Sequence, residues 1–213
     1  SMTKPKSPLL PLFTLPWLPA LAPGDHAHAE SLVTFAFTAI DDANPERIMT
    51  GLFTYDLDNI ATRTGTTSFS SPLGTTDFTN QPFFIQFSLD GSTSTIRRVP
   101  GGPFTEISIA NDAPLLGPIG TPPQDVFLIV SFATGAGPFF DFRLALIDED
   151  TDAFDTRLEL PTSLTLADFE TRTLTFFGGP GFPPPFVGTV ASLERSSVVI
   201  VPEPATLGLC GLM

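Results

Sequence analysis

The chain has 213 residues, and its 23 acidic residues outnumber its 10 basic residues, which gives a net charge of −13. A negative charge of this size disfavours binding to nucleic acid and to anionic membranes, because both depend on cationic side chains. Cys210 is the single cysteine, so an internal disulfide framework is excluded. A folded domain therefore needs its own hydrophobic core, which a chain of this length can supply.

The first 29 residues have the composition of an export signal. Two lysines precede an apolar run over residues 9–22, and Ala27 and Ala29 then form the small-x-small pattern that signal peptidase cleaves. We therefore predict a signal peptide over residues 1–29, with Ala27 and Ala29 as the signal-peptidase site and Glu30 as the first mature residue. A disordered Pro-rich leader is the alternative, since Pro8 precedes the apolar run and Pro11, Pro16 and Pro19 interrupt it.

Removal of this leader limits the chemistry that the chain can perform. Both lysines, both histidines and the single tryptophan precede Glu30, and the chain from Glu30 onward contains eight arginines and 22 acidic residues. Without His or Lys, the remaining chain cannot form a Ser-His-Asp catalytic triad, a Cys-His catalytic dyad, a Schiff base or an ordinary zinc site. It also contains no phosphate-binding loop with a lysine and no dinucleotide-binding fingerprint. We predict that the protein is not an enzyme, and a carboxylate glycosidase is the residual alternative.

The body of the chain alternates short apolar stretches with turn-forming residues. Val33, Phe35 and Phe37 alternate with small or polar residues, which is the period-two pattern of a half-buried strand. Asp90 and Gly91 follow another such stretch and are typical of a β-hairpin turn. The same criteria predict about nine strands, over residues 33–38, 51–56, 83–89, 93–99, 104–109, 126–132, 139–147, 171–177 and 186–193.

This pattern predicts an all-β fold, a single antiparallel β-sandwich of about nine strands with little helix. We expect one helical turn near residues 165–169. The 20 phenylalanines after residue 29 lie mostly at alternating positions and should fill the space between two sheets, with an aromatic ligand-binding platform as the alternative. Residues 58–81, 113–125 and 178–186 are rich in Thr, Ser, Gly or Pro and are predicted as loops, the last being a rigid connector or a partner site.

The chain ends in Val201-Pro-Glu-Pro-Ala-Thr-Leu-Gly-Leu and four further residues, and Pro202, Glu203 and Pro204 form a stiff extended triplet. This run resembles the PEP-CTERM sorting signal of exported bacterial proteins. The resemblance implies that an exosortase, an integral-membrane processing enzyme, recognises the triplet, and that a transmembrane helix and an Arg-rich tail follow it. Here nine residues without a basic cluster follow Pro204, fewer than the roughly 20 that span a bilayer. Either the sequence is truncated or the anchor is defective.

The body of the chain is also similar to secreted β-rich domains that carry this signal. The shared stretches are Gly51-Leu-Phe-Thr-Tyr-Asp56, Ile107-Ser-Ile-Ala-Asn-Asp112, Leu146-Ile-Asp148, Ala153-Phe154 and Leu160-Pro161. Those domains have no assigned activity, so the similarity implies a family without a mechanism. We predict a β-sandwich domain over residues 30–195, a linker over 196–201, and the sorting signal, truncated before a full membrane helix, over 202–213.

Together these features predict an exported protein of the cell surface or extracellular matrix with a non-catalytic structural or interaction role. The resemblance implies an exosortase-type enzyme and extracellular polysaccharide as partners, with transient membrane contact through the C-terminal signal. The negative charge indicates that nucleic acid is not a partner. A carbohydrate-binding, lectin-like module, with calcium assisting, is the alternative, followed by a carboxylate glycosidase. A shallow groove lined by aromatics and amides would favour binding, whereas two carboxyls roughly 5–10 Å apart in a deep cleft would favour hydrolysis.

One acidic cluster has the spacing of a calcium-binding loop. At the first, third, fifth and twelfth positions of such a loop stand Asp148, Asp150, Asp152 and Glu159. The seventh position would supply the Phe154 carbonyl, but Ala153 takes the sixth, where the sharp turn normally requires Gly. The flanks are also predicted strands instead of helices. Two interpretations remain, a Ca²⁺ site and a solvated acidic hairpin end, and no other cofactor is indicated.

Overall fold

The computed structural model describes residues 31–58, 63–64, 75–79, 81–82, 84–97, 103–114, 122–133, 139–156 and 159–197. The predicted signal peptide with Ala27 and Ala29, and the predicted sorting signal, lie outside these residues. Within them the chain forms β-strands and one turn of 3₁₀ helix, which confirms the all-β class. The elements are β1 (Leu32–Asp41), β2 (Ile48–Asp56), β3 (Arg63–Thr64), β4 (Thr75–Thr79), β5 (Phe84–Leu89), β6 (Ser92–Arg97), β7 (Phe104–Pro114), β8 (Pro123–Ala133), β9 (Phe140–Asp148), η1 (Leu166–Asp168), β10 (Thr171–Gly178) and β11 (Phe186–Arg195).

Each of the predicted strands overlaps a strand of the structure, and the predicted helical turn is η1. The predicted loop over residues 58–81 is wrong in part, because β3 and β4 pair with each other and β4 pairs with β7. Phe78 is the single large apolar residue of β4, so the sequence shows no period-two pattern there. The segment becomes a strand because β7 provides backbone hydrogen bonds along its edge. The predicted loop over 113–125 is also shorter, since β7 ends and β8 begins at a proline.

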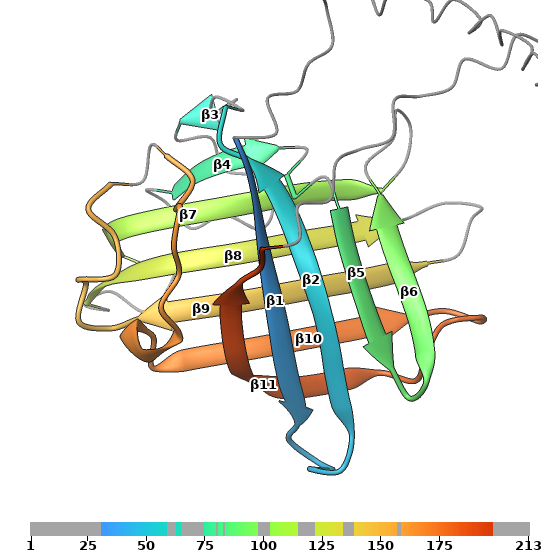
Figure 1. Cartoon of the computed structure of the whole chain (residues 1–213). Helices are drawn as coiled ribbons and strands as arrows, with labels where there is room; N and C mark the ends of the chain where they lie inside the picture. Colours follow the sequence, from blue (N-terminus) through green and yellow to red (C-terminus); the bar gives the residue numbers. More distant parts are fainter. Residues whose placement is uncertain are drawn as a thin grey trace, which may run out of the picture.

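All the strands belong to one antiparallel sheet, in the order β3-β4-β7-β8-β9-β10-β11-β1-β2-β5-β6. The sheet curls, so that β1, β2, β5 and β6 form a front layer that crosses over a back layer of β7, β8, β9 and β10 (Figure 1). β11 pairs with β10 of the back layer and with β1 of the front layer. The predicted sandwich is therefore made by a single sheet that folds over onto itself.

Two local features let the sheet turn at β11. The register of β1 and β11 shifts between Thr38 and Ala39, and such bulges bend the strand that carries them. Gly188 in β11 lies so close to β1 that a Cβ atom would be 2.3 Å from the carbonyl oxygen of Ile40. The absence of a side chain at Gly188 is therefore what allows the two strands to approach at the corner.

Phenylalanine rings fill the space between the layers, as predicted. Rings from the front layer meet rings from the back layer in pairs, and their centroids lie 6.1 Å apart for Phe53–Phe127, 5.7 Å for Phe87–Phe142 and 4.8 Å for Phe87–Phe176. Each of these rings is essentially inaccessible to solvent. Such offset or tilted pairs add to the hydrophobic effect of burying the rings. These phenylalanines therefore form the core and do not form a ligand-binding platform.

The hairpin between β5 and β6 is also confirmed. Asp90 and Gly91 have φ values of 53° and 77°, the left-handed conformations that a tight two-residue hairpin requires.

Among the described residues, no helix is long and apolar enough to cross a membrane.

Candidate functional site

The front layer presents two rows of hydroxyl, aliphatic and amide side chains on its outer face. Residues such as Phe37 and Phe53 turn into the core, so their neighbours in sequence turn outward. The strand register aligns these outward side chains across the strands. One row contains Ala36, Leu52, Gln86 and Thr95, and the other contains Thr38, Thr50, Ser88 and Thr93.

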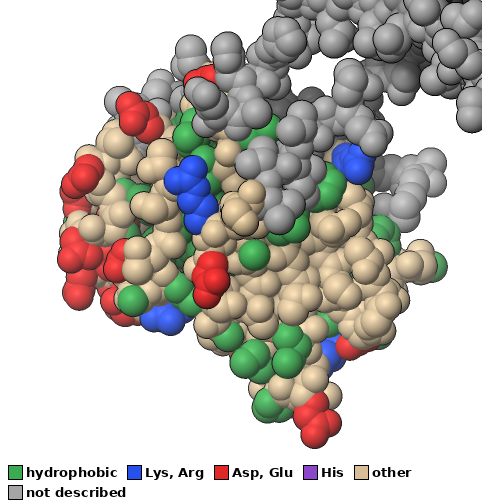
Figure 2. All heavy atoms as spheres, in the orientation of Figure 1, with side chains coloured by type: hydrophobic (Ala, Val, Ile, Leu, Met, Phe, Trp, Pro, Cys, Tyr) green, Lys and Arg blue, Asp and Glu red, His purple; other side chains and the backbone are tan. Residues whose placement is uncertain are grey.

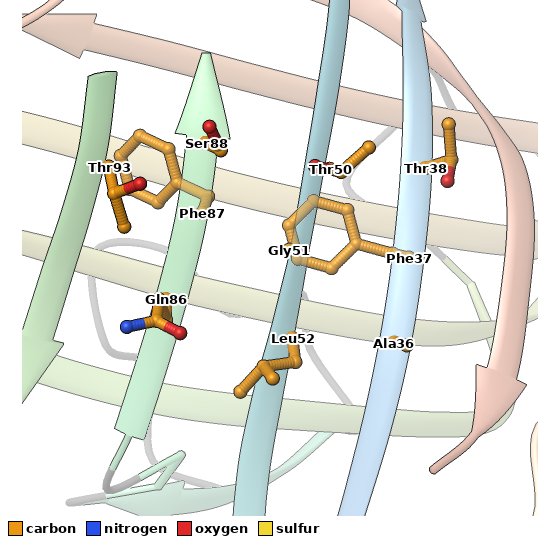
Figure 3. A pocket seen from close by; sticks show the side chains of 10 residues that line it. All are labelled: Ala36, Phe37, Thr38, Thr50, Gly51, Leu52, Gln86, Phe87, Ser88 and Thr93. Carbon is orange, nitrogen blue, oxygen red and sulfur yellow. The ribbon is translucent and has the colours of Figure 1, made fainter. Parts of the chain in front are cut away.

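A shallow hollow of about 400 Å³ lies between these rows (Figure 3). Its floor is a third row, Phe37, Gly51 and Phe87, which pair directly across β1, β2 and β5. The two phenylalanine side chains are buried in the core, so they present mainly backbone to the hollow. We call this hollow the cross-strand trough, and its lining residues are Ala36, Phe37, Thr38, Thr50, Gly51, Leu52, Gln86, Phe87, Ser88 and Thr93.

Gly51 sets the geometry of the trough floor. A Cβ atom at this position would lie 2.5 Å from the carbonyl oxygen of Gln86 and 2.6 Å from Cζ of Phe37. Both distances are shorter than van der Waals contact. Glycine therefore allows the Phe37 ring to pass beneath β2, and it keeps the sheet continuous at the centre of the trough.

The trough is uncharged although the protein is strongly acidic. Its lining includes four hydroxyls and the Gln86 amide but no Asp, Glu, Lys or Arg. Within the described part of the chain, none of the hydroxyls of Thr50, Ser88 and Thr93 has a hydrogen-bond partner, while Gln86 Nε2 donates to Thr95 Oγ1 at 3.4 Å. Figure 2 shows the same contrast, with acidic side chains along the left edge and an uncharged surface over the middle of the front layer.

The aromatic side chains that are exposed in the described residues lie elsewhere. They are Phe104 at the start of β7, Phe139 before β9 and Phe177 near the end of β10. The trough therefore has the amide expected of a binding groove, but it has hydroxyl and aliphatic groups in place of exposed aromatic rings.

The predicted calcium loop is organised around one carboxylate. Asp148 ends β9 and is buried, and its Oδ1 accepts a hydrogen bond from the backbone N–H of Asp150 at 2.8 Å. Its Oδ2 accepts hydrogen bonds from the N–H groups of Asp152 at 2.8 Å and Ala153 at 2.9 Å. Burial alone raises the pKa of Asp148, but the backbone N–H groups together lower this pKa below its ordinary value.

The other three predicted ligands do not join Asp148. Asp150, Asp152 and Glu159 are exposed, and no group of three or more acidic, His or Cys side chains among the described residues is arranged to hold a metal ion. Both oxygens of Asp148 are directed at backbone donors within its own loop. A Ca²⁺ site stays one of the two interpretations of this segment.

A second buried carboxylate stands opposite the first. Asp125 in β8 pairs with Asp148 in β9, and it anchors two further segments. Its Oδ1 accepts a hydrogen bond from the N–H of Asp112 at 2.8 Å, and its Oδ2 accepts one from the N–H of Phe154 at 2.9 Å. Burial raises the pKa of Asp125, and the nearby carboxylates of Asp112 and Asp148 act in the same direction. The pair holds the ends of loops together, and both carboxylates are buried.

Arg47, which no sequence pattern singled out, joins three segments at the end of the front layer that carries the β1–β2 and β5–β6 turns. Its Nε donates to Asp90 at 2.8 Å, and its Nη1 donates to Asp41 at 3.0 Å. Further bonds run from Nη1 to the carbonyl of Pro185 at 2.6 Å and from Nη2 to that of Pro184 at 2.8 Å. These contacts favour the rigid-connector interpretation of the Pro-rich segment before β11. A lone arginine after a turn gives no sequence signal for such distant partners.

Comparisons with protein-family models, with curated proteins and with solved structures gave no match for this chain.

Proposed function

We propose that this chain is an exported protein of the bacterial cell surface or extracellular matrix, with a non-catalytic interaction role. The signal-peptide pattern over residues 1–29 and the Pro202-Glu203-Pro204 triplet support export and processing by an exosortase-type enzyme. The interaction role is carried by one observation, the uncharged hydroxyl-lined face of a molecule whose net charge is −13. A polar but uncharged surface of this kind suits a polyhydroxylated partner, and extracellular polysaccharide is such a partner.

The front layer suits binding because the backbone that carries its polar groups is fixed before a ligand arrives. Thr50 and Ser88 belong to neighbouring strands in the middle of a continuous ladder, and the aromatic core lies directly beneath them. A preorganised surface loses little conformational entropy on binding. Carbohydrate binding is therefore the specific form of interaction that we favour. Asp125 and Asp148 do not favour a glycosidase, since both are buried and their oxygens accept backbone hydrogen bonds.

Cell fractionation tests this proposal. In a bacterium that has an exosortase, we expect the protein in the surface and matrix fractions, with a mature form that begins at Glu30. Intact-mass analysis identifies that form, because it lacks Lys4 and Lys6. Retention of the whole chain in the cytoplasm would contradict the proposed export, and removal of the matrix polysaccharide without release of the protein would contradict the proposed partner.

A further inference from the structure

The cross-strand trough has the shape of a site for a linear ligand. Its hydroxyl row, from Thr38 to Thr93, crosses β1, β2, β5 and β6 at right angles to the chain direction. Neighbouring strands are about 4.8 Å apart, so the four hydroxyls are spread over roughly 14 Å. The parallel row that contains Leu52 and Gln86 forms the opposite wall (Figure 3). A repeating polymer that lies between the rows can meet an equivalent group on each strand.

The groups on the walls match the chemistry of a sugar chain. A hydroxyl both donates and accepts hydrogen bonds, and the Gln86 amide provides both functions from separate atoms. Leu52, Ala36 and the threonine methyl groups provide apolar contacts for the C–H surfaces of sugar rings. Three of the wall hydroxyls have no partner within the described part of the chain, so ligand binding does not require the loss of an internal hydrogen bond.

The charges select against an acidic ligand. The lining of the trough contains no cation. Two charged residues stand beside its rows: Glu194 pairs with Ala36, and Arg97 pairs with Phe84, two residues before Gln86. The guanidinium of Arg97 lies over the Phe84 ring, 5.4 Å from the centroid, instead of over the trough. A polyanion would therefore approach a molecule with a net charge of −13 without a site that compensates its own charge.

We infer that the cross-strand trough binds a neutral polysaccharide chain that lies across β1, β2, β5 and β6. Hydroxyls of Thr50, Ser88 and Thr93 and the Gln86 amide form the hydrogen bonds, and Leu52 contacts the ring faces. This inference rests on the proposed function and deepens it, because it names the site and the class of polymer.

Affinity electrophoresis of the full chain tests the inference in the presence of a calcium chelator. The native gel contains dextran, hydroxyethylcellulose or mannan as a neutral polymer, or alginate as an acidic one. We expect at least one neutral polymer to retard the protein and alginate to leave its migration unchanged. The triple variant Thr50→Val, Ser88→Ala and Thr93→Val removes three hydroxyls and should bind about tenfold more weakly. Thr50→Glu, which places a charge at the centre of the trough, should abolish the retardation.

Thr173→Val and Thr173→Glu are the matched controls. Thr173 is exposed on β10, away from the trough, and both controls should bind as the parent protein does. Circular dichroism and thermal melts identify any variant that does not fold. Loss of retardation in the Thr173 variants would overturn the assignment to the trough, as would unchanged binding by the triple variant.

Three further results would also overturn the inference. They are the absence of retardation by all the neutral polymers, equal retardation by alginate, and a dimer of the parent protein that Thr50→Glu dissociates. The last result would show that a second copy of the chain occupies the trough. None of these results bears on export. A protein that reaches the surface but binds no neutral polymer would therefore contradict the trough as a binding site and leave the proposed export in place.

Discussion

Replacement of Arg47 by alanine should destabilise the fold more than a surface arginine ordinarily does. Arg47 is 15% exposed and bridges Asp41 at the end of β1, Asp90 in the β5–β6 turn and the Pro-rich connector before β11. Its guanidinium also lies over the Phe186 ring, 5.7 Å from the centroid. The change removes four side-chain hydrogen bonds and leaves the Asp41 carboxylate, which is 8% exposed, without its cation.

The size of the effect follows from how far each partner is sheltered from water. A hydrogen bond to a charged group contributes about 1.5–3 kcal/mol when it is sheltered and much less when it is exposed. Asp90 is 39% exposed and both proline carbonyls are exposed, so water replaces much of what those bonds supply. We therefore expect Arg47→Ala to lower the free energy of unfolding by about 2–3 kcal/mol. For a domain of this size, such a loss lowers the melting temperature by about 5–10 °C.

Urea unfolding followed by circular dichroism measures this loss. Arg143→Ala is the matched control, because Arg143 is 56% exposed and pairs with Asp141 two residues away on the same strand. The control should change stability by less than about 1 kcal/mol. Arg47→Lys keeps the charge but not the planar fork, and it should fall between the parent protein and Arg47→Ala. Equal effects of Arg47→Ala and Arg143→Ala would refute the reasoning that Arg47 joins the three segments.

Four further predictions follow from the structure and the sequence. Gly51→Ala should lower the free energy of unfolding by about 1–3 kcal/mol, because the new methyl group meets Phe37 and Gln86, whereas Thr50→Ala should change it much less in the same urea titration. The pKa of Asp148 is lowered on folding, so its stabilising contribution is present above its unfolded pKa, about 3.9, and is lost as the pH falls through the folded value. Asp148→Asn should therefore be less stable than the parent protein at pH 7, and the difference between the two should shrink as melts are repeated toward pH 2. Millimolar calcium should leave the melting temperature at its value in chelator, because the oxygens of Asp148 already accept backbone hydrogen bonds. If calcium instead raises the melting temperature, and the double variant Asp150→Asn and Asp152→Asn does not show this rise, the calcium site is established. In a version extended by a membrane helix and basic tail, Glu203→Ala should impair processing without unfolding the domain, and normal processing of that variant on immunoblots would remove the triplet from the sorting mechanism.

Most of the local structure of this protein could be predicted from the sequence. Alternation of core residues such as Phe35 and Phe37 with outward residues identified the central strands, because the side-chain period of a strand is a property of neighbouring positions. Asp90 and Gly91 likewise identified the β5–β6 turn from their tolerance of positive φ. Export and sorting also rest on short continuous motifs, and these remain predictions.

How the strands combine and which side chains meet could be read only from the folded structure. β4 has a weak pattern and becomes a strand because β7 offers it a ladder, and the two layers arise from one sheet because β11 pairs with both. Arg47 finds partners 43, 137 and 138 residues away, and Asp125 holds Phe154, which is 29 residues away. The rows of the trough likewise depend on the register of separate strands. The local pattern of apolar residues does not specify these long-range contacts, because they depend on which strands pack together around the aromatic core.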